Sequence, residues 1–98
     1  MKLTLRSSQI RLKNRKKAIK LIWKGAEDMK LDGIQIFRST RRTSGYGKKP
    51  LFTTTKDKYY NTSVKTGTKY YYKVRGFVTI DGEKIYTQYS TKAWRTVK

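Results

Sequence analysis

Short runs of alternating apolar and polar residues constrain the fold of this chain more than any other feature of its sequence. The first run begins at Leu3, and the longest covers residues 70–78. A period of two with Thr, Ile, Val and Tyr enriched is typical of half-buried β-strands. Turn sequences such as Lys65-Thr66-Gly67 and Asp81-Gly82 separate the runs. The pattern predicts an all-β chain of six or seven antiparallel strands, arranged as a sandwich or a barrel.

One stretch also fits a helix. Five residues there have helical spacing and an apolar character, namely Ala18, Leu21, Ile22, Ala26 and Met29. Gly25 would cost such a helix about 1 kcal/mol relative to alanine. We therefore predict a strand over residues 18–24.

The Asp81-Gly82 pair is the strongest local turn signal. A two-residue loop of this type tolerates the positive φ angles that a tight hairpin needs, and it fixes the register of the strands on either side. The register places Phe77 opposite Tyr86 and, in the absence of a bulge, Val74 opposite Tyr89. The less charged face is predicted to lie inside, and it contains Tyr70, Tyr72, Val74, Gly76, Val78, Ile85, Thr87 and Tyr89. The same register without a bulge also pairs Arg75 with Gln88 and Tyr71 with Lys92.

The composition disfavours most enzymes. The chain has no Cys and no His, which removes thiolate nucleophiles, the usual general base and the commonest zinc ligands. Its six carboxylates fall in predicted loops: Glu27, Asp28, Asp32, Asp57, Asp81 and Glu83. No calcium-loop motif is present, and no apolar run approaches the roughly 20 residues of a membrane span. We predict no catalysis, no metal, no cofactor and no membrane span.

The positive charge is the most informative anomaly. The formal net charge is +19, and residues 1–26 contain nine basic residues and no acid. We single out an N-terminal basic patch of Arg11, Lys13, Arg15, Lys16 and Lys17. Crowded like charges cost stability, so they suggest a polyanionic partner: nucleic acid, a wall polymer such as teichoic acid, or an acidic protein. The alternative is that the charge confers only solubility.

Three spaced motifs resemble the fibronectin type III family, in the Lys- and Tyr-rich version found on surface proteins of Gram-positive bacteria and their phages. They are Ile19-Lys20-Leu21-Ile22-Trp23, the stretch from Asp32 to Thr40, and the stretch from Val64 to Arg75. The resemblance implies a seven-stranded Ig-like sandwich of two sheets with Trp23 in its core. It also places Tyr70 at the family's tyrosine corner, where the hydroxyl group bonds back to the upstream backbone.

The implied strand order gathers aromatic and cationic residues on one outer face: Phe37, Tyr71, Lys73, Arg75, Phe77 and Tyr86. This face could stack sugars or bases while its cations meet phosphates. It could instead stabilise the hairpin through cross-strand pairs, or pack on another subunit. We favour the protein interface.

The resemblance leads to a functional expectation for residues 1–98 as a single domain. Beginning at Met1 without an export signal, the chain suits a non-catalytic accessory or decoration protein of a phage virion, packed on other subunits and adsorbing weakly to anionic host surfaces. The alternative is a spacer or wall-polymer-binding module of a Gram-positive cell-surface protein. A basic nucleic-acid-binding protein is the third hypothesis, weakened by the absence of a reader motif.

Overall fold

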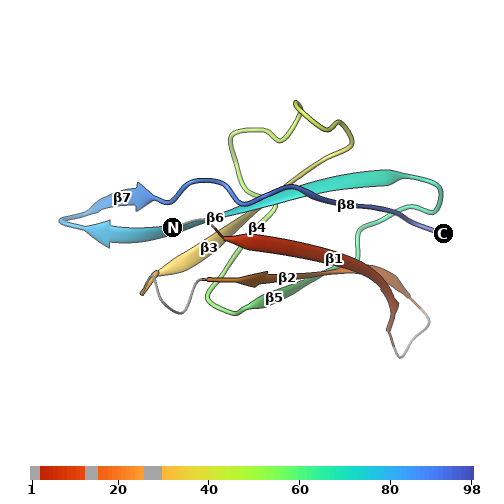
Figure 1. Ribbon diagram of the computed structural model, residues 1–98, viewed down its shortest axis with the longest axis horizontal. Helices are drawn as coiled ribbons and strands as arrows, with labels where there is room; N and C mark the ends of the chain where they lie inside the picture. Colours follow the sequence, from red (N-terminus) through yellow and green to blue (C-terminus); the bar gives the residue numbers. More distant parts are fainter. Residues whose placement is uncertain (1–2, 13–15, 26–29) are drawn as a thin grey trace.

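The protein consists of β-strands joined by turns and loops (Figure 1). A computed structural model describes residues 3–12, 16–25 and 30–98. The strands are β1 (Thr4–Arg11), β2 (Lys17–Lys24), β3 (Gly33–Ser39), β4 (Phe52–Thr54), β5 (Lys58–Asn61), β6 (Lys69–Ile80), β7 (Glu83–Tyr86) and β8 (Ala93–Thr96). In the part of the chain so described, no helix is long and apolar enough to cross a membrane.

The strands form two antiparallel sheets that face each other. One has the order β1-β2-β5, and the other has the order β4-β3-β6-β7, with β8 also paired to β6. The expected all-β sandwich is confirmed, and residues 17–24 form a strand instead of a helix. The described residues form eight strands where we expected seven, because the last strand is interrupted and appears as β7 and β8.

Trp23 lies in the core between the two sheets. It is fully buried, together with Leu21, Ile36 and Tyr72. The hydroxyl group of Tyr70 accepts a hydrogen bond from the backbone N–H of Lys65 at 3.0 Å. This contact is the tyrosine corner that the resemblance implied.

The hairpin between β6 and β7 follows the predicted register as far as Tyr86. Asp81 and Gly82 have φ angles of 51° and 82°, which is the left-handed geometry of the predicted turn. Phe77 lies opposite Tyr86, and Val78 lies opposite Ile85.

The predicted register still holds at Thr87, whose backbone N–H donates to the Gly76 carbonyl at 2.9 Å, and it is wrong after Thr87. The Thr87 and Ser90 hydroxyl groups accept hydrogen bonds from the backbone N–H groups of Gly76 and Val74, at 2.9 and 3.0 Å. Side chains that capture backbone donors in this way interrupt a strand ladder and insert extra residues, as in a β-bulge.

The interruption changes the partners of β6. Tyr71 pairs with Trp94 where we expected Lys92. Ser90 replaces Tyr89 opposite Val74 and is buried. Tyr89 therefore turns to the outer face, against our prediction that it lies inside.

The β6–β7 hairpin extends past the ends of β1 and β2, at the far left of Figure 1. Its predicted inner face consequently meets no opposing sheet there. Ile85, which we expected to be buried, is 52% exposed, and Ile80 is equally exposed.

Tyr72 is part of a polar network inside the sandwich. Its hydroxyl group donates to Asn61 Oδ1 at 2.6 Å, and Arg38 Nη1 donates to the same oxygen at 3.0 Å. Burial raises the pKa of the Tyr72 phenol well above its usual value, and the nearby Arg38 guanidinium lowers it only in part.

This raised pKa predicts a loss of stability at high pH. Above about pH 10 the unfolded Tyr72 releases its proton while the folded one retains it, so the free energy of unfolding falls by up to about 1.4 kcal/mol per pH unit. Tyr72→Phe should remove this contribution. Urea unfolding of the wild-type and Tyr72→Phe proteins between about pH 10 and 11.5 measures this contribution. If the free energy of unfolding fell equally with pH in both proteins, the raised pKa of Tyr72 would be contradicted.

Candidate functional site: a cation–aromatic face

The outer face of the β4-β3-β6-β7 sheet brings the six predicted site residues together. Tyr71, Lys73, Arg75 and Phe77 alternate along β6. On the neighbouring strands, Phe37 of β3 lies opposite Lys73, and Tyr86 of β7 lies opposite Phe77. The strand spacing therefore assembles the face that the sequence indicated.

Two half-buried cations on β6 lie against the aromatic rings of this face. The Lys73 ammonium group is 3.9 Å from the ring centre of Tyr89 and 4.6 Å from that of Tyr46. The Arg75 guanidinium group is 3.7 Å from the ring centre of Tyr86 and 5.0 Å from that of Tyr89. We call Tyr46, Lys73, Arg75, Tyr86 and Tyr89 the cation–aromatic strip.

The electrostatics of the strip reflect crowding. Burial lowers the pKa of Lys73, and the like charges of Lys92 and Arg75 lower it further. Burial raises the pKa of Tyr46, and the nearby Tyr71 raises this pKa further. The positive charge of Arg42 lowers it in part. Lys73 and Arg75 thus interact mainly with the aromatic rings around them.

Phe37 and Phe77 are not exposed, which corrects our expectation of an open aromatic patch. Phe37 is only 1% exposed, because the Tyr89 ring packs edge-on at 5.5 Å and Arg75 lies 5.3 Å from its ring centre. Phe77 packs against Gly33, and the Lys84 ammonium group lies 5.0 Å from its ring centre.

Three residues of this face, Tyr46, Tyr89 and Trp94, were not predicted from the sequence. Tyr89 reaches it through the strand interruption, and Tyr46 reaches it from the loop between β3 and β4. Trp94, which the sequence left unassigned, lies beside Tyr71 with a ring-centre distance of 6.2 Å. The hydroxyl residues Thr87 and Ser90 were the available signal, because such residues favour irregular backbone.

The centre of the strip is therefore a packing element, and its two ends are the exposed parts. Protein cations already cover the rings of Tyr46 and Tyr89, so these rings have little free surface for a ligand. At one end Tyr86 is 43% exposed on the hairpin, and near the other end Trp94 is 48% exposed. These two ends are the available binding surfaces of the face.

Arg75 should stabilise the strip through its planar guanidinium group. Its Nε donates to the buried Gln35 Oε1 at 2.9 Å, in addition to its ring contacts. Arg75→Lys keeps the charge but loses this geometry, so we expect the free energy of unfolding to fall by about 1–2 kcal/mol. Arg41→Lys, the same change at an exposed loop residue, should alter it by less than about 0.5 kcal/mol. Equal effects in urea unfolding would show that the strip contributes nothing specific.

The predicted N-terminal basic patch is only partly described. Arg11 and Lys17 are register partners at the end of the β1–β2 pair, and Lys17 Nζ donates to Thr66 Oγ1 at 3.0 Å. Lys16 is exposed. Lys13 and Arg15 lie outside the described residues.

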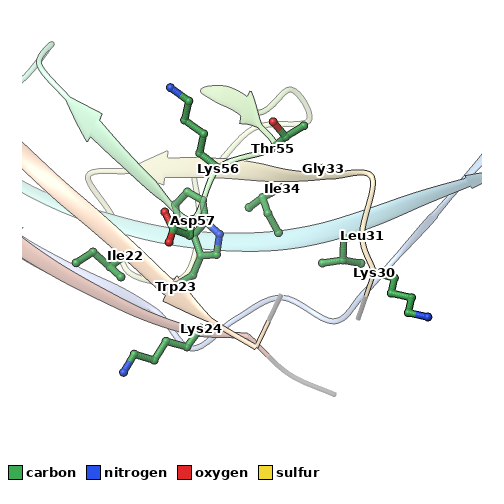
Figure 2. A pocket seen from close by; sticks show the side chains of 10 residues that line it. All are labelled: Ile22, Trp23, Lys24, Lys30, Leu31, Gly33, Ile34, Thr55, Lys56 and Asp57. Carbon is green, nitrogen blue, oxygen red and sulfur yellow. The ribbon is translucent and has the colours of Figure 1, made fainter. Parts of the chain in front are cut away.

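A hollow of about 720 Å³ lies beside Trp23 at one end of the sandwich. Figure 2 shows that the ammonium groups of Lys24, Lys30 and Lys56 point away from its centre. Asp57 supplies the one carboxylate among the described residues that line it. No cluster of three potential metal-ligating side chains occurs within residues 3–12, 16–25 and 30–98.

The comparison with solved structures found a similar fold. No family model and no curated protein matches the sequence. The crystal structure of a Fn3-like protein from Clostridium thermocellum aligns with 96% of this chain and 92% of its own, at 27% sequence identity and a TM-score of 0.67. The likeness supports a domain module, and a fold of this kind carries many unrelated functions and does not by itself identify one. The chain therefore folds as a fibronectin type III-like β-sandwich domain.

Proposed function

We propose that this protein is a non-catalytic docking module of a phage virion, an accessory or decoration protein that packs on other virion subunits through the β6–β7 hairpin. The protein would then be located in the assembled virion. A large positive charge would also let such a particle adsorb weakly to an anionic host surface.

The exposed hairpin is the observation that supports this proposal. All four residues of β7 are exposed, and β7 is the outermost strand of the described sheet on this side. Ile80 and Ile85 are each 52% exposed on one face of the hairpin, and Tyr86 is exposed on the other. Apolar side chains beside an open strand edge suit a protein partner. Such a partner can cover the apolar side chains and form backbone hydrogen bonds with the open edge.

A charge placed on the apolar face of the hairpin tests the proposal. In particles assembled with Ile80→Lys or Ile85→Lys, we expect the copy number of this protein to fall at least about tenfold, because a buried lysine without a partner is costly. Thr79→Lys is the matched control, since Thr79 is exposed on the opposite face of the same strand. Quantitative mass spectrometry of purified particles gives the copy number. Absence of the wild-type protein from particles, or equal occupancy of all variants, would refute the proposal.

The alternative function is a spacer or wall-polymer-binding module of a Gram-positive cell-surface protein, and the net charge of +19 favours it. Its partner would be an anionic polymer such as teichoic acid. The neighbouring coding sequence discriminates between the two. Capsid and tail genes support the virion protein, and an encoded export signal with repeated domains supports the surface protein.

A further inference from the structure

A basic groove runs along the side of the sandwich where the edge of β1 faces β8. Its volume is about 650 Å³. The polar and aromatic side chains that line it are Arg6, Ser7, Ser8, Lys20, Lys92, Trp94 and Arg95. Figure 1 places β8 at the end of β6 opposite to the hairpin, so the groove is separate from the proposed docking surface.

Side chains hold the two walls of the groove together. Ser7 Oγ donates to the backbone carbonyl of Trp94 at 3.1 Å, and Arg95 Nε donates to the backbone carbonyl of Ser7 at 2.9 Å. The Gln9 amide both donates to and accepts from the backbone of Lys98, at 3.0 and 2.8 Å. These four contacts fix β1 against β8 and the C-terminal residue that follows it, so the groove is formed before any ligand binds.

The charge of the groove has one sign. Its described lining includes Arg6, Lys20, Lys92 and Arg95 and contains no carboxylate. Like charges that line one groove repel one another, and an anion would relieve the repulsion. Guanidinium groups match the two oxygens of a phosphate or a carboxylate group.

Trp94 adds a second recognition element. Its indole is 48% exposed, and Arg42 lies 5.8 Å from its ring centre. An exposed aromatic ring bordered by serine hydroxyl groups offers a stacking surface for a sugar ring and polar partners for its hydroxyl groups. Trp94 is the one aromatic residue in the described lining, whereas single-stranded nucleic acid needs a series of rings for successive bases.

We propose that the β1–β8 groove binds an anionic sugar chain, with the four cations contacting its phosphate or carboxylate groups and Trp94 stacking on one of its sugar rings. This site differs from the basic patch that the sequence indicated, and it does not depend on the hairpin. Recognition by ring and charge together distinguishes it from attraction by net charge alone.

The test measures binding of the purified protein to phosphorylated dextran, carboxymethyl dextran, neutral dextran, inorganic polyphosphate and oligo-dT by calorimetry over a range of salt concentrations. We expect one of the two anionic dextrans to bind at least about tenfold more tightly than neutral dextran or polyphosphate. Trp94→Ala should weaken that binding about tenfold and leave the polyphosphate affinity within about twofold, while Trp94→Phe should retain most of it.

Two pairs of substitutions separate the groove from the overall charge. Arg6→Gln with Lys20→Gln should weaken dextran binding and reduce the magnitude of its salt dependence by roughly one to two units of slope. Lys48→Gln with Lys49→Gln removes the same charge from an exposed loop and should have a much smaller effect. Far-ultraviolet circular dichroism verifies that each variant is folded. Equal effects of the two pairs, no effect of Trp94→Ala, or tighter binding of oligo-dT that depends on Trp94 would each overturn the proposal.

Discussion

Trp23→Ala is expected to bring the domain close to the limit of its stability. The substitution opens a cavity between the two sheets, and a buried tryptophan truncated to alanine costs about 3–5 kcal/mol. A domain of this size has a free energy of unfolding of about 5–15 kcal/mol, so the loss is a large fraction of the total. Urea unfolding followed by far-ultraviolet circular dichroism measures it.

Trp94→Ala is the matched control, because Trp94 is 48% exposed where Trp23 is 2% exposed. We expect its free energy of unfolding to change by less than about 1 kcal/mol. The indole N–H of Trp23 has no hydrogen-bond partner among the described residues, so Trp23→Phe should cost less than Trp23→Ala. Similar losses for Trp23→Ala and Trp94→Ala would place the core elsewhere.

Asn61→Ala should have the second largest effect. Asn61 is buried, and its side-chain oxygen accepts hydrogen bonds from both Tyr72 and Arg38. Its amide nitrogen donates to Ser63 Oγ at 3.0 Å. Removal leaves the hydroxyl proton of the fully buried Tyr72 without its acceptor, so we expect a loss of about 2–4 kcal/mol.

A double-mutant cycle identifies the cause of that loss. If the stranded hydroxyl group is responsible, adding Tyr72→Phe to Asn61→Ala should cost little more than Asn61→Ala alone, with a coupling of about 1–2 kcal/mol. Strictly additive losses would show that the two side chains stabilise the fold independently.

The sequence predicted those parts of the fold that depend on local pattern. Alternation identified β2 as a strand despite its helix-compatible spacing, and Asp81-Gly82 gave the turn and the pairs as far as Tyr86. The prediction failed after Thr87, because the hydroxyl groups of Thr87 and Ser90 take over backbone donors of β6. A pattern of apolar residues carries no information about such side-chain bonds, so the two later shifts in register were out of its reach.

The sequence predicted which residues of β6 belong to the candidate site, but it did not predict which of the site's side chains are exposed. Tyr71, Lys73, Arg75 and Phe77 share a face because side chains alternate in a strand. The burial of Phe37 depends on Tyr89, which reaches the same face only through the interruption between β7 and β8. The β1–β8 groove joins residues from opposite ends of the chain, and no local signal connects them.

The β6–β7 hairpin and the β1–β8 groove have different roles in the function that we propose for this domain. The hairpin combines an open strand edge with apolar side chains and suits a protein. The groove combines four cations with one exposed indole and suits an anionic sugar chain. A domain with one surface of each kind could link a larger assembly to an anionic polymer.

Hydrogen exchange of the protein in its native particle, compared with the isolated protein, tests the docking claim most directly. We predict that the backbone N–H groups of β7 and the 81–82 turn exchange more slowly in the particle, because a partner covers the hairpin and its open edge. The N–H groups of the β1-β2-β5 sheet should exchange at similar rates in both states. Unchanged exchange in the hairpin, with slowing confined to the other sheet, would contradict the account.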